Sequence, residues 1–274
     1  MSLSIASLNS GSNGNCYYIG NGHEAVLVDV GISCRETERR MARLGLPMDA
    51  VKAIFISHEH SDHIRGLEVL SRKHGLPVHI TEKTRAYAGL RLEEHLVRPL
   101  HAYEPVTVGG LSVQAFPKFH DAADPHSFMV SGNGVNIGVL TDIGSVCRHV
   151  TDHFKRCHAA FLETNYDDGM LDRGRYPYHL KNRIRGNRGH LSNAQALELF
   201  LAHKPDFMSH VLLSHLSADN NCPRLVRDLF SAHAPHTDVV VASRHEATAV
   251  YEIHAGETTA LPLPGPASQL SLMF

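Results

Sequence analysis

The sequence predicts a layered α/β fold in one domain. Short apolar runs bounded by turn residues indicate strands, and segments whose apolar residues recur at helical spacing indicate helices. Both kinds of segment occur in each half of the 274-residue chain, which favours strands and helices packed in layers. A chain of this length suits one large domain with a sizeable core.

The expected strands fall into two groups. Tight turns separate several of them, and Gly132-Asn133-Gly134 between apolar residues 128–130 and 135–137 indicates a hairpin. Strands are expected at 5–8, 24–30, 53–57, 78–80, 111–116 and 135–140, and again at 209–213, 238–242 and 247–253.

Helices are expected between these strands. Ser192 is a suitable N-cap, and Pro205 lies just beyond the end of the helix that Ser192 would begin. Pro223 stands in the first turn of another expected helix. The four expected helices span 34–44, 64–74, 193–203 and 223–233.

The composition is that of an ordinary soluble protein. The net charge of −2 gives no global attraction to nucleic acid or to an anionic membrane, so a basic binding surface has to be local. The 5 cysteines form no C-x-x-C pair, which indicates free thiols in a reducing compartment. No secretory signal and no membrane-spanning apolar run is visible. We therefore expect a cytoplasmic protein without a membrane partner.

The C-terminal segment differs from the rest of the chain. Its 261–266 stretch is rich in Pro and Gly and cannot form a helix or a central strand. We expect a folded domain at 1–257 and a flexible tail at 258–274.

One short segment has the composition of a metal site. His58, His60, Asp62 and His63 follow the strand expected at 53–57. Imidazole nitrogen and carboxylate oxygen are donors that suit Zn(II), Mn(II) or Fe(II). His58 and His60 can serve one metal, while Asp62 and His63 serve a neighbouring one. A single such residue is usually only a polar loop residue, but this spacing favours ligands.

Further ligands are needed to complete two sites, and three candidates stand just after expected strands. They are His120, Asp142 and His215. Asp142 has two carboxylate oxygens and can bridge two metals. We therefore expect two divalent ions, with binding residues gathered at strand ends.

These motifs resemble, in their order, those of the metallo-β-lactamase superfamily. Asp29 resembles the first motif, the segment from His58 to His63 the second, and His120, Asp142 and His215 the later ones. The resemblance runs from about residue 4 to residue 253. It implies an αββα four-layer sandwich with the metals at one edge.

Within the superfamily, the chain resembles the YycJ/WalJ-type group, whose members are described as DNA exonucleases. This resemblance rests on segments 10–16, 120–125, 162–167, 189–192 and 213–221. It implies a dinuclear metal-dependent phosphodiesterase, a DNA exonuclease of 5′→3′ polarity that acts in DNA repair or replication.

The resemblance also suggests roles for residues around the metals. Asp29 is expected to orient a ligand histidine through its second ring nitrogen. Asp62 is expected to hold a metal and to orient the attacking water. Glu163 is expected to keep His190 protonated, so that His190 contacts the phosphate and donates a proton to the leaving oxygen.

Several residues are candidates for nucleic-acid binding. Lys181, Arg183, Arg185 and Arg188 form a basic run without an acid, and we expect a loop there that contacts the phosphate backbone. Neutral hydrogen-bond donors to phosphate are expected from Asn220, Asn221, Ser12 and Asn13.

The last six residues resemble the peptide by which bacterial DNA enzymes bind the sliding clamp. Gln269 is followed by Leu270, Leu272 and Phe274, which can fill an apolar groove from an extended segment. A clamp partner favours DNA over RNA. Three alternatives stay open: a hydrolase of small esters or thioesters, an RNA-processing nuclease and a non-catalytic metal-binding protein.

Overall fold

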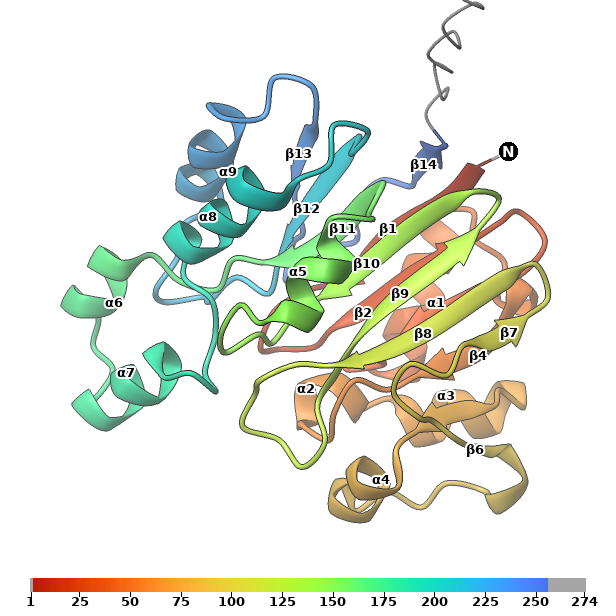
Figure 1. Cartoon of the computed structure of the whole chain (residues 1–274). Helices are drawn as coiled ribbons and strands as arrows, with labels where there is room; N and C mark the ends of the chain where they lie inside the picture. The colour runs from red at the N-terminus through yellow and green to blue at the C-terminus, as the bar shows by residue number, and fades with distance from the viewer. Residues whose placement is uncertain (1, 256–274) are drawn as a thin grey trace, which may run out of the picture.

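The computed structural model describes residues 2–255 and contains two seven-stranded sheets packed face to face (Figure 1). The first sheet has the order β14-β1-β2-β3-β4-β5-β6. Its strands are β14 (Tyr251–His254), β1 (Ser2–Asn9), β2 (Cys16–Gly20), β3 (Ala25–Val28), β4 (Val51–Phe55), β5 (Val78–Ile80) and β6 (Val97–Pro99). Strands β3 to β6 are parallel, and the others pair antiparallel.

The second sheet has a matching arrangement. Its order is β13-β12-β11-β10-β9-β8-β7, with β10 to β13 parallel and the rest antiparallel. The strands are β13 (Asp238–Val241), β12 (His210–Ser214), β11 (Ala159–Glu163), β10 (Val135–Leu140), β9 (His126–Gly132), β8 (Leu111–Pro117) and β7 (Val106–Val108).

Helices cover the outer face of each sheet (Figure 1). On the first sheet lie α1 (Cys34–Arg43) and α3 (Leu67–His74), and on the second α5 (Arg148–Phe154), α8 (Asn193–His203) and α9 (Pro223–Ser231). The shorter helices are α2 (Ser61–Ile64), α4 (Glu82–Ala88), α6 (Asp168–Arg173) and α7 (Tyr178–Arg185), with 3₁₀ turns at Met48–Ala50 and Glu94–Leu96. Within residues 2–255, no helix is long and apolar enough to span a bilayer.

Three apolar layers hold the sandwich together. Tyr17, Phe55 and Phe161 pack between the sheets, where the inward faces of both sheets meet. A second layer under α5, α8 and α9 and a third under α1 and α3 pack the helices onto the sheets. Burial of these apolar faces is the main stabilising contribution. The expected αββα sandwich is confirmed.

Some local expectations were wrong. The expected helix at 64–74 is two helices separated at Gly66, where a side chain would clash because an added Cβ would lie 1.9 Å from the Ile32 carbonyl oxygen. Strand β14 begins only at Tyr251, later than the expected strand at 247–253. The expected loop at 181–188 is helical as far as Arg185, because Leu, Lys and Arg favour helices and Gly186 ends the run. The expected domain end at 257 and the tail at 258–274, with Gln269, Leu270, Leu272 and Phe274, lie outside the described residues.

Candidate metal centre

The candidate metal centre forms where strands of both sheets end. Parallel strands of one sheet end at a common edge, so the residues that follow them come together there. Asp29 follows β3, His58 follows β4, Asp142 follows β10, Glu163 ends β11 and His215 follows β12.

Three of these residues have left-handed backbone conformations. The φ angles are 59° at Asp29, 54° at Asp142 and 58° at His215. A non-glycine residue is strained in this region and persists there only where the surroundings hold it. The sharp turns end the strands and place all three side chains over the same edge.

Histidines from two strand ends form the first group of donors. His58, His60 and His120 each offer a ring nitrogen, and these atoms lie within 4.8 Å of one another. His58 and His120 are buried, and His60 is half-buried. Burial lowers the pKa of His58 well below its ordinary value and that of His120 to about 3. Both rings are therefore neutral, which is the form that binds a metal.

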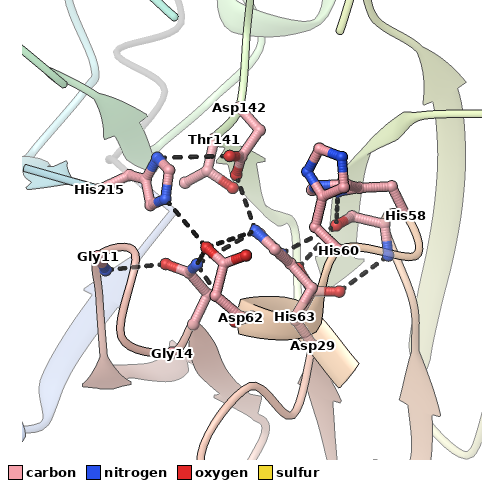
Figure 2. Close-up of polar contacts among 12 residues, drawn as sticks. Gly11, Gly14, Asp29, His58, His60, Asp62, His63, Thr141, Asp142 and His215 are labelled. Carbon is pink, nitrogen blue, oxygen red and sulfur yellow. Dashed lines mark hydrogen bonds and ion pairs between the residues drawn. The ribbon is translucent and has the colours of Figure 1, made fainter. Parts of the chain in front are cut away.

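A second group lies beside the first (Figure 2). The Oδ2 atom of Asp62 lies 3.6 Å from His63 Nε2 and 3.5 Å from His215 Nε2. Asp142 stands between the groups, because its Oδ2 is 3.2 Å from His63 Nε2 and its Oδ1 is 3.8 Å from His120 Nε2. The structure thus brings all seven expected ligands together.

The residues fit divalent metal ions. His120 Nε2, Asp142 Oδ2 and His215 Nε2 are buried without a hydrogen-bond partner among the described residues. Leaving buried polar atoms unsatisfied costs free energy, which a ligand can recover. Nitrogen and carboxylate donors in this arrangement suit Zn(II) and Mn(II) alike.

Asp29 lies behind His63 and contacts its ring. Its Oδ2 accepts a hydrogen bond from His63 Nδ1 at 2.7 Å, and its oxygens also accept from the amide and hydroxyl of Ser57, both at 2.8 Å. Bonding at Nδ1 leaves His63 Nε2 directed at the donor cluster (Figure 2). Asp29 therefore fixes the orientation of this ring.

A sequence model of the beta-lactamase superfamily domain matches residues 24–216. The chain belongs to the metallo-β-lactamase superfamily. It is 36% identical over 235 residues to exodeoxyribonuclease YycJ of Bacillus anthracis, covering 83% of this chain and 87% of that protein. It is 31% identical over 225 residues to exodeoxyribonuclease WalJ of Streptococcus pneumoniae serotype 2, covering 80% and 83%.

The fold agrees with solved structures of the metallo-β-lactamase superfamily. The metallo-beta-lactamase fold protein YhfI from Bacillus subtilis superposes with a TM-score of 0.69, covering 92% of this chain and 99% of that one. At 15% identity this likeness shows the fold alone. The family assignment and the relatives together make the chain a metal-dependent hydrolase.

Glu163 and His190 lie beside the cluster of candidate metal ligands. Glu163 Oε1 accepts a hydrogen bond from His190 Nδ1 at 2.8 Å. Glu163 is fully buried, while the His190 side chain keeps 19% of its surface exposed. Burial raises the pKa of Glu163, but the charge and hydrogen bond of His190 outweigh this effect and lower it to about 2. The His190 ring centroid lies 5.2 Å from those of His120 and His215, so His190 stands at the mouth of the cluster.

The expected basic run is partly neutralised by acids. Arg183 Nε lies 2.6 Å from Asp121 Oδ2, and Arg185 forms an ion pair with Asp172. Lys181 donates to the backbone carbonyl of Asp172. Arg188 is exposed. The acids that pair with this run come from other segments, so the sequence run alone did not reveal them.

The expected neutral donors differ in their placement. Asn220 and Asn221 are buried, and Asn221 Nδ2 donates to the carbonyl oxygens of Thr164 at 2.8 Å and Asn165 at 3.1 Å. Asn221 therefore holds the strand ends together and does not offer its amide to a ligand, which corrects the expectation for this residue. Ser12 and Asn13 are exposed, but Asn13 Nδ2 donates to the Arg244 carbonyl at 2.7 Å.

Two residues near the centre were missed. Asn15 Nδ2 lies 3.2 Å from Asp62 Oδ2 and so restrains this ligand. Lys118 is buried and donates to the Thr141 carbonyl at 2.7 Å. Burial lowers the pKa of Lys118, while Asp142 and Asp29 oppose this change. The sequence could have indicated Lys118 by its position just after β8, two residues before His120.

Proposed function

We propose that the chain is a dinuclear metal-dependent phosphodiesterase, a DNA exonuclease of 5′→3′ polarity that acts in repair or replication in the cytoplasm. The names of the relatives, both exodeoxyribonucleases, support this substrate class. The observation that carries the proposal is the Glu163–His190 pair beside the donor cluster, because it supplies a positioned proton donor next to a site for an anionic group.

Two metal ions are proposed at the cluster. His58, His60 and His120 would hold one ion, and Asp62, His63 and His215 the other, with Asp142 shared. When bound, divalent ions lower the pKa of water and neutralise the charge of a phosphodiester.

The remaining chemistry belongs to side chains of this chain. Glu163 accepts the His190 Nδ1 hydrogen, which orients the ring and leaves Nε2 for the substrate. His190 then contacts the phosphate and donates a proton to the leaving oxygen. Asp62 orients the attacking water, and Asp29 holds the His63 ring in place.

The tail is proposed to bind a DNA sliding clamp. Its residues Gln269, Leu270, Leu272 and Phe274 lie outside the described residues, so this proposal rests on the sequence pattern. Clamp binding would favour DNA over RNA as the substrate.

A direct comparison of substrates tests the reaction class. The purified protein is supplied with Zn(II) or Mn(II) and assayed on bis(p-nitrophenyl) phosphate and on a glutathione thioester. We expect hydrolysis of the phosphodiester, and its loss in Asp62→Ala. Hydrolysis of the thioester alone would overturn the proposal in favour of a small-substrate hydrolase.

A further inference from the structure

A cavity of about 430 Å³ lies next to the metal centre. Ser10, Leu216 and Ser217 line one side of it. The other lining residues are Ala218, Asn221, Pro223 and Arg227 of α9, and 241–246, which begin at the end of β13. The candidate ligands and the Glu163–His190 pair do not line this cavity, so it is a separate feature of the fold.

The cavity and the metal centre share a wall. The Ser10 hydroxyl accepts a hydrogen bond from the His215 amide at 2.7 Å, and Leu216 directly follows this ligand in the chain. Gly11 has a φ of +135°, and a Cβ there would lie 3.4 Å from both the Arg244 Cβ and the Leu216 carbonyl oxygen. A group bound in the cavity would therefore lie one residue away from a metal ligand.

Two arginines of the cavity have no anionic partner in the described part of the chain. The Arg244 Nη1 atom is buried without a hydrogen bond, and within residues 2–255 neither Arg244 nor Arg227 forms an ion pair. Arg183 and Arg185, by contrast, are both paired with acids. A buried guanidinium nitrogen without an acceptor is unfavourable, and an anion would satisfy it.

The other lining groups suit a ligand in which an anionic group is joined to a largely apolar part. The peptide dipoles of the first turn of α9 favour negative charge, and Arg227 lies in the next turn. Leu216, Pro223 and Val241 give the cavity an apolar wall. Glu246 is the one acid among the lining residues. A nucleotide combines a phosphate with a flat, largely apolar base, which matches this lining.

We propose that this cavity binds a nucleotide of the polynucleotide substrate next to the scissile phosphodiester, with Arg244 and Arg227 on its phosphate. The proposal rests on the phosphodiesterase function proposed above. It makes Arg244, which stands far from the metal motifs in sequence, a residue that determines the preference for a polynucleotide over a small diester.

Binding of a short fluorescein-labelled single-stranded DNA to the full chain tests the cavity. We expect Arg244→Ala to weaken binding about tenfold. It should also reduce the slope of log affinity against log salt concentration by about one. Arg244→Lys keeps the charge but not the planar fork, so it should retain the salt slope and recover only part of the affinity. The matched control is Arg224→Ala, because Arg224 is exposed on the same helix but does not line the cavity.

Hydrolysis assays distinguish a failure of the cavity proposal from a failure of the proposed phosphodiesterase function. We expect Arg244→Ala to lose about tenfold more activity on the DNA than on bis(p-nitrophenyl) phosphate, with an unchanged melting temperature. If wild-type protein cleaves DNA and Arg244→Ala matches Arg224→Ala in binding and cleavage, the role of the cavity is overturned and the phosphodiesterase stands. If wild-type protein cleaves neither substrate, the phosphodiesterase is overturned, and equal binding by the two variants would then overturn the cavity as well.

Discussion

The Nδ1 atom of His190 lies 2.8 Å from Glu163 Oε1, and the second carboxylate oxygen of Glu163 accepts hydrogen bonds from the amides of Ile143 at 2.6 Å and Leu191 at 3.3 Å. The backbone on both sides therefore fixes the carboxylate before any substrate arrives. The fixed carboxylate in turn fixes the His190 ring. This relationship fixes the direction of the His190 ring beside the candidate metal ligands, as the proposed role of proton donor requires.

His190→Ala should reduce turnover of a phosphodiester by roughly a hundredfold or more, because a positioned general acid contributes at least this factor. Metal content, measured by atomic emission, should stay at the wild-type value. His95→Ala is a suitable control, since His95 is exposed and its side chain lies outside the site. Loss of metal from His190→Ala would show instead that His190 is a ligand.

Asp29→Asn should weaken metal binding about 10- to 100-fold, because an amide cannot replace the carboxylate that orients His63. Asn tolerates the left-handed backbone at this position better than most residues, so the fold should be kept. Competition with a chelator measures the affinity, and circular dichroism checks the fold. The exposed Asp49→Asn is the matched control. Equal affinity in both variants would exclude this role for Asp29.

His79 should make stability depend on pH away from the metal centre. Its ring stacks on Phe55 with centroids 4.5 Å apart, and burial lowers its pKa from 6.5 to about 4. As the pH falls, the unfolded chain therefore takes up a proton at His79 before the folded protein does. The neutral ring makes its full contribution to the unfolding free energy above pH 6.5, and this contribution is lost progressively as the pH falls from 6.5 toward 4.

His79→Phe should remove this dependence while keeping the stacked ring. Between pH 7 and pH 5 the wild-type protein should lose about 2 kcal/mol more unfolding free energy than the variant. Denaturant unfolding at both pH values measures the difference, and the other titrating groups cancel in the comparison. The same loss in both proteins would contradict the assignment.

Deletion of residues 269–274 should abolish capture by an immobilised bacterial sliding clamp and leave cleavage of a short DNA unchanged. The apolar anchors Leu270, Leu272 and Phe274 would supply the binding free energy, so their joint replacement by Ala should have the same effect. Equal capture of the intact and shortened chains would end the clamp hypothesis.

The candidate ligands could be named from the sequence because they follow a local pattern. His58, His60, Asp62 and His63 lie in one short segment, and the other candidates each stand just after a recognisable apolar strand. The strand β11 was missed because its first residues are alanines, which have little strand preference. Glu163 could thus be named from the resemblance, but its place in the sheet could not.

The ion-pair partners of the arginines could not be predicted from the sequence in this way. Arg183 and Arg185 look like free charges in the sequence, but the fold brings Asp121 and Asp172 beside them. For Arg244 the reverse holds. Its Nη1 atom has no hydrogen-bond partner among the described residues, but nothing near it in the sequence indicates this. Whether a charge is available to a ligand depends on residues distant in the chain, and only the packed structure brings these together.

An assay on 5′- and 3′-end-labelled DNA and RNA, single- and double-stranded, with Zn(II) and with Mn(II), would show directly whether the chain is a metal-dependent DNA exonuclease. We expect metal-dependent degradation of DNA from its 5′ end and no cleavage by Asp62→Ala, since Asp62 would hold one ion and orient the attacking water. Cleavage of RNA with DNA left intact, or DNA cleavage that persists in Asp62→Ala, would contradict it.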